Sequence, residues 1–315
     1  MLLHVVHETH YAYTPAVKTA QHMAHLKPVS LPHQHVLLHH LQIDPPPELQ
    51  TESLDDWGNP RAFFSLETAH DELVVVAESL VATETVIPPR SDLSWEQVRE
   101  RMHYRAGAPY EPAAEFVFTS PYAPRSDVFA DYARPCFGPG VPLLYAVSAL
   151  MMRIHEEFQF DPQSTDVSTP ALEALAHKRG VCQDFAHVMV ACCRSLGLPA
   201  RYVSGYLLTE PAPGQPRLVG ADASHAWASV WLPTAPGQGQ WVDFDPTNNR
   251  APGEDYVVLA RGRDYADVSP IRGVIRGGAD HTLSVQVTVT PCDSRSDRQS
   301  QSQSQSQSQS QSQSQ

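Results

Sequence analysis

A cysteine stands at the start of the most clearly patterned helix in this sequence. Apolar residues recur at three- and four-residue steps from Phe185 to Leu196, which predicts a buried helix that ends near Gly197 and Pro199. Cys182 precedes this apolar stripe, in the first turn. The unpaired N–H groups and the positive dipole end of a helix stabilise a thiolate, the nucleophilic form of cysteine. The sequence therefore predicts a reactive cysteine on a buried helix.

Two segments rich in aromatic and β-branched residues follow this helix. They cover residues 223–232 and 240–248, and a stretch rich in Pro and Gly separates them. This pattern predicts two antiparallel strands. Alternation along a strand places His225 and Trp227 on one face of the first strand, and Asp243 and Asp245 on one face of the second.

The register of these two strands decides which carboxylate meets the histidine. We expect His225 opposite Asp245, which leaves a short loop at residues 234–236. Cross-strand neighbours lie roughly 4.5–5.5 Å apart at Cβ, which suits an imidazole hydrogen-bonded to a carboxylate. Nucleophile, base and orienting carboxylate together are typical of Cys-His-Asp acyl transfer. Strand periodicity alone leaves both Asp243 and Asp245 open.

At these residues the sequence resembles the bacterial transglutaminase-like family, whose papain-like core carries Cys, His and Asp in this order. The matching motifs are G-V-C-Q-D-F-A at Cys182, S-H-A-W-A at His225 and D-F-D-P-T at Asp245. The family places its carboxylate directly before Pro-Thr, so the resemblance selects Asp245 over Asp243. The likeness covers roughly residues 1–290 and implies a catalytic triad.

The resemblance implies a cysteine-dependent amide hydrolase or acyltransferase, of the peptidase or transglutaminase type, that works through a thioester. The expected partner is a peptide or protein amide substrate, and an amine acceptor stays open. We slightly favour hydrolysis, because water is present at ~55 M and the sequence contains no identifiable amine site. The alternative is a non-catalytic peptide- or protein-binding module on the same fold.

Three neighbours of the triad are candidate substrate or oxyanion residues. Gln183 could help polarise an acyl oxygen, beside the backbone N–H groups at the helix start. Asp184 lies in the first helical turn, where an acidic residue usually serves the helix dipole. Trp227 could wall the site, although core packing explains it equally well.

Composition narrows the classes of partner and the compartment. The formal net charge is −13 and the basic residues are scattered, so we expect no nucleic-acid partner. No apolar run approaches the roughly 20 residues of a membrane span, and no secretory signal is visible at the start. Five cysteines without disulfide spacing fit a reducing cytoplasm.

The chain is expected to form an α+β protein in which helices pack on an antiparallel sheet, preceded by a β-rich N-terminal domain. A helix is predicted from Pro142 to about Phe158. The expected divisions are a β-rich domain at 1–85, a connecting segment at 86–140, a transglutaminase-like catalytic core at 141–292 and a disordered Ser-Gln tail at 293–315.

The N-terminal histidines invite a different function, that of a metal-binding protein. Nine of the sixteen histidines fall within the first 40 residues, but their spacing is irregular and no cysteine or acidic cluster joins them. No loop of closely spaced acidic residues with Gly indicates calcium. We therefore expect neither a metal site nor a cofactor.

Overall fold

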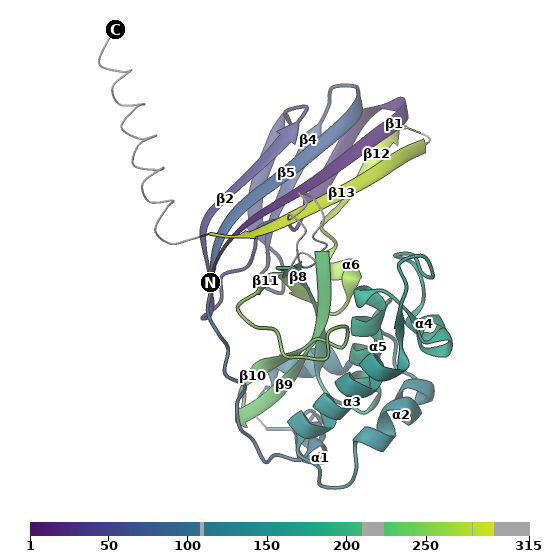
Figure 1. Ribbon diagram of the computed structural model, residues 1–315. Coiled ribbons are helices and arrows are strands. Elements are labelled where there is room, and N and C mark those ends of the chain that lie inside the picture. The colour runs from purple at the N-terminus through teal and green to yellow at the C-terminus, as the bar shows by residue number, and fades with distance from the viewer. Residues whose placement is uncertain (108–109, 210–223, 279, 293–315) are drawn as a thin grey trace, which may run out of the picture.

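Two antiparallel sheets, one above the other, organise the computed structural model of this protein (Figure 1). The upper sheet begins at the N-terminus, and the lower sheet is covered by helices on one face. This arrangement confirms the predicted α+β class with a β-rich N-terminal domain. The structure describes residues 1–107, 110–209, 224–278 and 280–292.

The upper sheet is built around β1, which is long enough to have different neighbours along its two halves. Its strand order is β2-β5-β1-β4-β3, and β12 and β13 also pair with β1. One cluster of its buried residues includes Phe64, Leu66 and Leu73. The strands are β1 (Leu2–Ala24), β2 (Gln34–Asp44), β3 (Leu49–Leu54), β4 (Pro60–Leu66), β5 (His70–Thr83), β12 (Ile271–Gly277) and β13 (Asp280–Pro291).

The end of the chain returns to this first sheet. β12 pairs with β1 from Val17 to Ala24, and β13 pairs with β1 from Leu3 to Thr14. The expected catalytic core at 141–292 included both strands, so the observed packing moves that boundary to about residue 270. Alternation in a sequence identifies a strand and its buried face, but it does not identify the sheet that the strand joins.

The lower sheet has the order β10-β9-β8-β11, and the helices pack on one of its faces. Its strands are β8 (Ala200–Leu207), β9 (Ser224–Ala235), β10 (Gln238–Phe244) and β11 (Tyr256–Gly262), and a separate pair joins β6 (Gln159–Phe160) to β7 (Arg179–Gly180). The helices are α1 (Trp95–Arg101), α2 (Asp127–Ala133), α3 (Leu143–Glu157), α4 (Ala171–His177), α5 (Cys182–Ser195) and α6 (Tyr265–Val268), with single 3-10 turns η1 (Pro112–Val117) and η2 (Arg134–Cys136).

Helix α5 lies at the centre of this lower unit, and the structure confirms both long helices that the sequence predicts. Every α5 residue from Asp184 to Arg194 is buried, because the helix has the sheet on one side and other helices around the rest. Helix α3 covers the predicted segment from Pro142 to Phe158 with a difference of one residue at each end.

The segment at 86–140 contributes to this core instead of only connecting the two domains. Trp95 and Val98 of α1 and Phe129 of α2 are buried in the same apolar cluster as α3 and α5. A helix start capped at Asp92 or Ser94 is predicted from the sequence, and α1 begins there with Ser94 as its cap. Both helices are only seven residues long, so their apolar periodicity is too short to predict that they pack in the core.

The hairpin of β9 and β10 has a register different from the predicted one. Phe244 pairs with Ala228, where the predicted register would pair it with Ala226, so the strands are shifted by two residues. The expected loop at 234–236 is wrong because the ladder continues through the Pro/Gly-rich stretch to a tight turn. Gly237 supplies the positive φ of +71° in that turn. The shift preserves the faces, since side chains alternate with a period of two.

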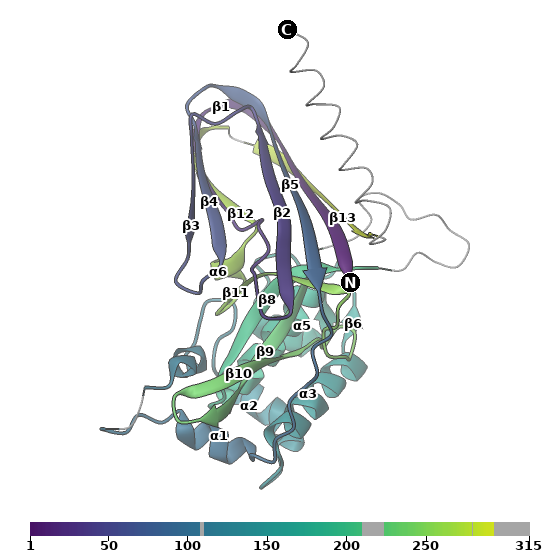
Figure 2. The ribbon, with the colours of Figure 1, turned by 90° about the vertical axis from the view of Figure 1, so that its left-hand side faces the viewer.

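An apolar layer joins the two sheets. Leu3, Val5 and Val81 of the upper sheet pack with Tyr206 of β8 and Val257 of β11. Figure 2 shows β8 and β11 directly beneath the lower ends of the upper strands.

No helix in the described part of the chain is long and apolar enough to cross a membrane.

Candidate active site

Cys182, His225 and Asp245 meet where α5 begins, β9 begins and β10 has just ended. The Nε2 atom of His225 lies 2.7 Å from Oδ2 of Asp245. The Cys182 thiol lies close enough to the same imidazole to raise its pKa, and its Sγ atom lies 4.0 Å from the Ser224 carbonyl oxygen. Because Nε2 faces the carboxylate, Nδ1 is the ring nitrogen left for the thiol. The structure thus brings together the three residues predicted from the motifs, despite the shifted register.

Cys182 occupies the first position of α5, and the turn before it is held by one carboxylate. Oδ2 of Asp184 accepts hydrogen bonds of 2.8 Å from the Val181 N–H and from the Thr165 hydroxyl. Gly180 has a φ of +156°, and a Cβ atom there would lie 2.4 Å from Oδ2 of Asp184. Glycine is therefore required at this position for the loop to pass so close to the carboxylate. Asp184 serves the helix start, as its position in the first turn suggested.

The electrostatics of the imidazole favour its charged form. Burial acts to lower the pKa of His225, but the hydrogen bonds to Asp245 and Cys182 outweigh it and raise the pKa from 6.5 to about 10. For Asp245, burial acts to raise the pKa, and the bonds from His225 and its other donors lower it overall. A buried imidazolium paired with a carboxylate is the arrangement that stabilises a neighbouring thiolate.

Asp245 has a full set of hydrogen-bond donors and no exposed surface. Its Oδ1 accepts from the Thr247 and Asn248 N–H groups at 2.9 and 3.2 Å. Its Oδ2 accepts from Nδ2 of Asn248 and from the Tyr256 hydroxyl, both at 2.7 Å. These contacts orient the carboxylate toward His225.

Sequence reasoning missed Asn248 and Tyr256 as members of this network. Asn248 follows Asp245 by three residues, and an Asp that bonds backbone N–H groups two and three positions later is a local turn motif that could have been recognised. Tyr256 belongs to β11, and no local pattern connects it with Asp245.

The remaining candidates lie beside the triad without completing an oxyanion site. Gln183 donates from Nε2 to the Val167 carbonyl at 3.1 Å, so this bond ties the side chain to the loop before α4. Trp227 is fully buried and packs edge-on against Tyr256, with 5.4 Å between ring centroids. Asp243 lies opposite Ser229, farther along the sheet from His225.

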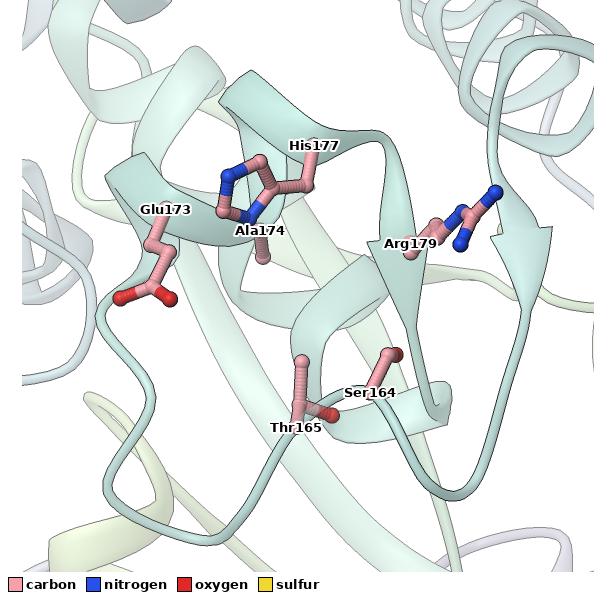
Figure 3. Close-up of a pocket in the computed structure, with 6 residues that line it drawn as sticks. All are labelled: Ser164, Thr165, Glu173, Ala174, His177 and Arg179. Carbon is pink, nitrogen blue, oxygen red and sulfur yellow. The ribbon is translucent and has the colours of Figure 1, made fainter.

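A cavity of about 340 Å³ opens beside the loop that supports the helix start. Its lining combines hydroxyl groups with charged side chains of both signs: Ser164, Thr165, Glu173, Ala174, His177 and Arg179 (Figure 3). Thr165 connects this wall to the active site, because its hydroxyl is bonded to Asp184. None of the triad residues lines the cavity.

The N-terminal histidines have separate partners in the structure. His7 lies 2.9 Å from the Tyr206 hydroxyl, His22 stacks on Phe64, and His25 lies 3.4 Å from a carboxylate oxygen of Asp55. Across the described ranges, no three His, Cys, Asp or Glu side chains gather where they could hold a metal ion. No disulfide joins any of the five cysteines, all of which lie in the described ranges.

Comparison with known proteins agrees with this architecture. Residues 130–246 match the transglutaminase-like superfamily, and residues 3–82 match the bacterial transglutaminase-like N-terminal region. An uncharacterized protein of Mycobacterium tuberculosis is 39% identical over 296 residues, which cover 91% of this chain and 92% of the relative. An uncharacterized protein of Mycobacterium leprae is 32% identical over 291 residues, 91% of this chain and 98% of that one.

One further relative and one solved structure carry functional descriptions. A protein-glutamine gamma-glutamyltransferase of Pseudomonas aeruginosa is 34% identical over 160 residues, 47% of this chain but only 23% of that protein. The crystal structure of a candidate cysteine protease from Cytophaga hutchinsonii superposes with a TM-score of 0.69 at 22% identity, covering 93% of this chain and 91% of that one, which shows a shared fold. With both regions matched and relatives aligned over nearly its whole length, this chain belongs to the transglutaminase-like superfamily, in the bacterial group that carries its own N-terminal domain.

Proposed function

We propose that this protein is a cysteine-dependent amide hydrolase or acyltransferase whose nucleophile is Cys182. The observation that carries the proposal is the 2.7 Å contact between His225 and Asp245, with the Cys182 thiol beside the same ring. This arrangement holds an imidazolium beside a sulfur atom at a helix start, and both features favour the thiolate.

In the first half-reaction, the Cys182 thiolate attacks the carbonyl carbon of a peptide bond or carboxamide. The developing oxyanion is stabilised by backbone N–H groups at the start of α5, which need no reorganisation. His225 then passes its proton to the departing nitrogen, and the C–N bond breaks to leave a thioester on Cys182. Asp245 keeps the ring oriented and stabilises its charged form throughout.

In the second half-reaction, His225 takes a proton from the incoming nucleophile, which attacks the thioester carbonyl and releases the thiolate. Water yields a carboxylic acid, and an amine yields a new amide. The relatives include both a candidate cysteine protease and a glutamyltransferase, so the superfamily accommodates either outcome. We favour hydrolysis, because water at ~55 M competes with any amine that lacks a dedicated site.

The test is alkylation by iodoacetamide across a range of pH, with each cysteine followed by mass spectrometry. An activated thiolate reacts at pH values well below about 8.5, the pKa of an ordinary cysteine. Cys136, Cys192 and Cys193 are internal controls, because burial raises the pKa of each of these thiols. We expect only Cys182 to react rapidly at pH 6.

The matching variant is Cys182→Ala, which should fold normally and lose turnover of peptide and glutamine amides. Retained turnover in this variant would refute the assignment. If Cys182 in the wild type reacts no faster than Cys136, the triad is not functional, and the protein is better described as a binding module.

A further inference from the structure

Strand β11 forms one edge of the lower sheet, and two carboxamide side chains from the N-terminal domain occupy that edge. Gln34 accepts from the Val258 N–H and donates to the Val258 carbonyl, both at 2.7 Å. Asn59 makes the same pair of bonds with Arg261, at 2.8 and 2.7 Å. Each side chain therefore replaces the neighbouring strand that an edge residue lacks.

The Gln34 contact coincides with an irregularity in β11. The pairing of β11 with β8 shifts between Val258 and Ala260, which is the signature of a β-bulge. The bulged residue is Leu259, whereas Val258 stays paired with Gly205 and turns its N–H and carbonyl toward the open edge. Buried backbone groups of that kind are costly unless another partner satisfies them. Gln34 is 1% exposed, so its carboxamide supplies those partners in the absence of water.

Gln34 also fixes a second segment against the active site. Its Nε2 atom donates to the Val29 carbonyl at 2.7 Å. Val29 packs in one apolar cluster with Trp227, Tyr256 and Val258. The carboxamide thus connects the N-terminal domain with the layer of side chains directly behind the triad.

Tyr256 connects this layer with Asp245. It begins β11, two residues before Val258, and its hydroxyl donates to Asp245 at 2.7 Å. Burial and the neighbouring Asp245 raise the pKa of Tyr256, so the hydroxyl stays protonated and remains a donor. The other charged groups at this ring are His225, with 5.9 Å between ring centroids, Arg250, 4.6 Å from the ring centroid, and the ion-pair partner of Arg250, Asp255.

We propose that Gln34 is a positioning residue for the reaction, acting from the N-terminal domain through Val258 of β11 and Tyr256 on Asp245. This inference rests on the proposed function, because it assigns Gln34 a role in orienting the carboxylate of the triad. It gives the N-terminal domain a part in catalysis that requires no contact between that domain and the substrate.

Asn59 provides a matched control within the same chain. It is fully buried and brackets the same strand edge with the same chemistry. Its contact lies at Arg261, three residues farther from Tyr256 than Val258 is. Loss of either carboxamide should therefore destabilise the fold, whereas only the loss of Gln34 should change the behaviour of the triad.

The experiment compares Gln34→Met with Asn59→Leu, two substitutions that keep the approximate length of the side chain and delete the carboxamide. Each should lower the melting temperature by roughly 5 °C, because each leaves buried backbone groups unpaired. In Gln34→Met, a misplaced Asp245 supports the imidazolium less well. The midpoint of the Cys182 alkylation profile should move about one pH unit upward, and kcat should fall about tenfold with KM within about twofold. Asn59→Leu should leave the profile and kcat within about twofold of the wild type.

A double-mutant cycle tests the route through Tyr256. If Gln34 acts through that hydroxyl, Gln34→Met should add little to the profile shift already caused by Tyr256→Phe. Should Gln34→Met fail to fold, Gln34→Asn, which keeps the carboxamide one methylene short, is judged by the same criteria.

The outcomes separate this inference from the proposed function. A folded Gln34 variant with the wild-type alkylation profile would overturn the positioning role and leave the reactive Cys182 intact. An equal shift in Asn59→Leu would also overturn it, because the effect would then be a general loss of stability. An unreactive Cys182 in the wild type would instead overturn the proposed function.

Discussion

Cys182 and Asp245 lie on opposite sides of the same imidazole, but their supports come from very different distances along the chain. On the cysteine side, Gly180, Val181, Asp184 and Thr165 hold the helix start, and the longest of these contacts spans 19 residues. On the carboxylate side, the network continues through Tyr256 to Val258, whose contact with Gln34 spans 224 residues.

The support of Asp245 depends on the complete fold more than the support of Cys182 does. Cys182 is held by a loop and a helix turn that lie within residues 165–184. The carboxylate is held partly by its own turn and partly by an edge strand, which needs the N-terminal domain to satisfy its backbone. A substitution that destabilises the domain junction should therefore disturb Asp245 and His225 more than it disturbs Cys182.

Among the changes at Asp245 and its supports, Asp245→Asn should have the largest effect on turnover. This change keeps the shape but removes the charge that orients and stabilises the imidazolium, so turnover should fall by about 10³–10⁴-fold. Asp243→Asn is the matched control, since Asp243 lies on the same face opposite Ser229 and should leave turnover within about threefold. A comparable loss in both variants would mean that Asp245 has no special relation to His225.

The same variant changes the pH dependence of stability. The pKa of His225 is raised from 6.5 to about 10, so its contribution to the free energy of unfolding is complete below about pH 6.5 and is lost as the pH rises toward 10. Chemical denaturation at several pH values should show this decline in the wild type and a flatter profile in Asp245→Asn.

The parts of the site that could be predicted from sequence are those held by local contacts. Cys182 and its helix form a local pattern, because helix periodicity and the first-turn position are encoded within about fifteen residues. The contacts of Asp245 with Thr247 and Asn248 are equally local, and attention to the turn could have predicted them.

The remaining features depend on contacts that no local pattern specifies. The register of β9 and β10 depends on a two-residue turn at Gly237, where the Pro/Gly-rich text suggested a longer loop. The return of β12 and β13 to the first sheet depends on which strand has a free edge, and alternation is the same for either sheet. The role of Gln34 is invisible in sequence, because a carboxamide near a strand start is ordinarily a surface residue.

Gly180→Ala should disturb the loop that holds Cys182, with an effect of intermediate size. The new methyl group would meet Asp184 at 2.4 Å and force its carboxylate away from the Val181 N–H and the Thr165 hydroxyl. We expect a loss of about 3 kcal/mol in the free energy of unfolding, together with slower alkylation of Cys182. Gly140→Ala is the control, because Gly140 has a φ of +71° but open space around it, so it should cost only about 1 kcal/mol. Equal losses in the two variants would show that backbone strain, and not the carboxylate contact, explains the glycine.

Tyr256→Phe should have the smallest effect, and it tests directly whether the support of Asp245 depends on a residue far away in the chain. It removes one hydroxyl that donates to Asp245 and leaves the ring packed on Trp227. Besides His225, Asp245 keeps three other protein donors, so turnover should fall only about tenfold, the value of one hydrogen bond to a charged group. The alkylation midpoint should rise by up to about one pH unit, because the carboxylate is less well held against His225. Turnover and alkylation profiles both matching the wild type would mean that Thr247 and Asn248 suffice to orient Asp245, and the carboxylate side would then be as local as the cysteine side.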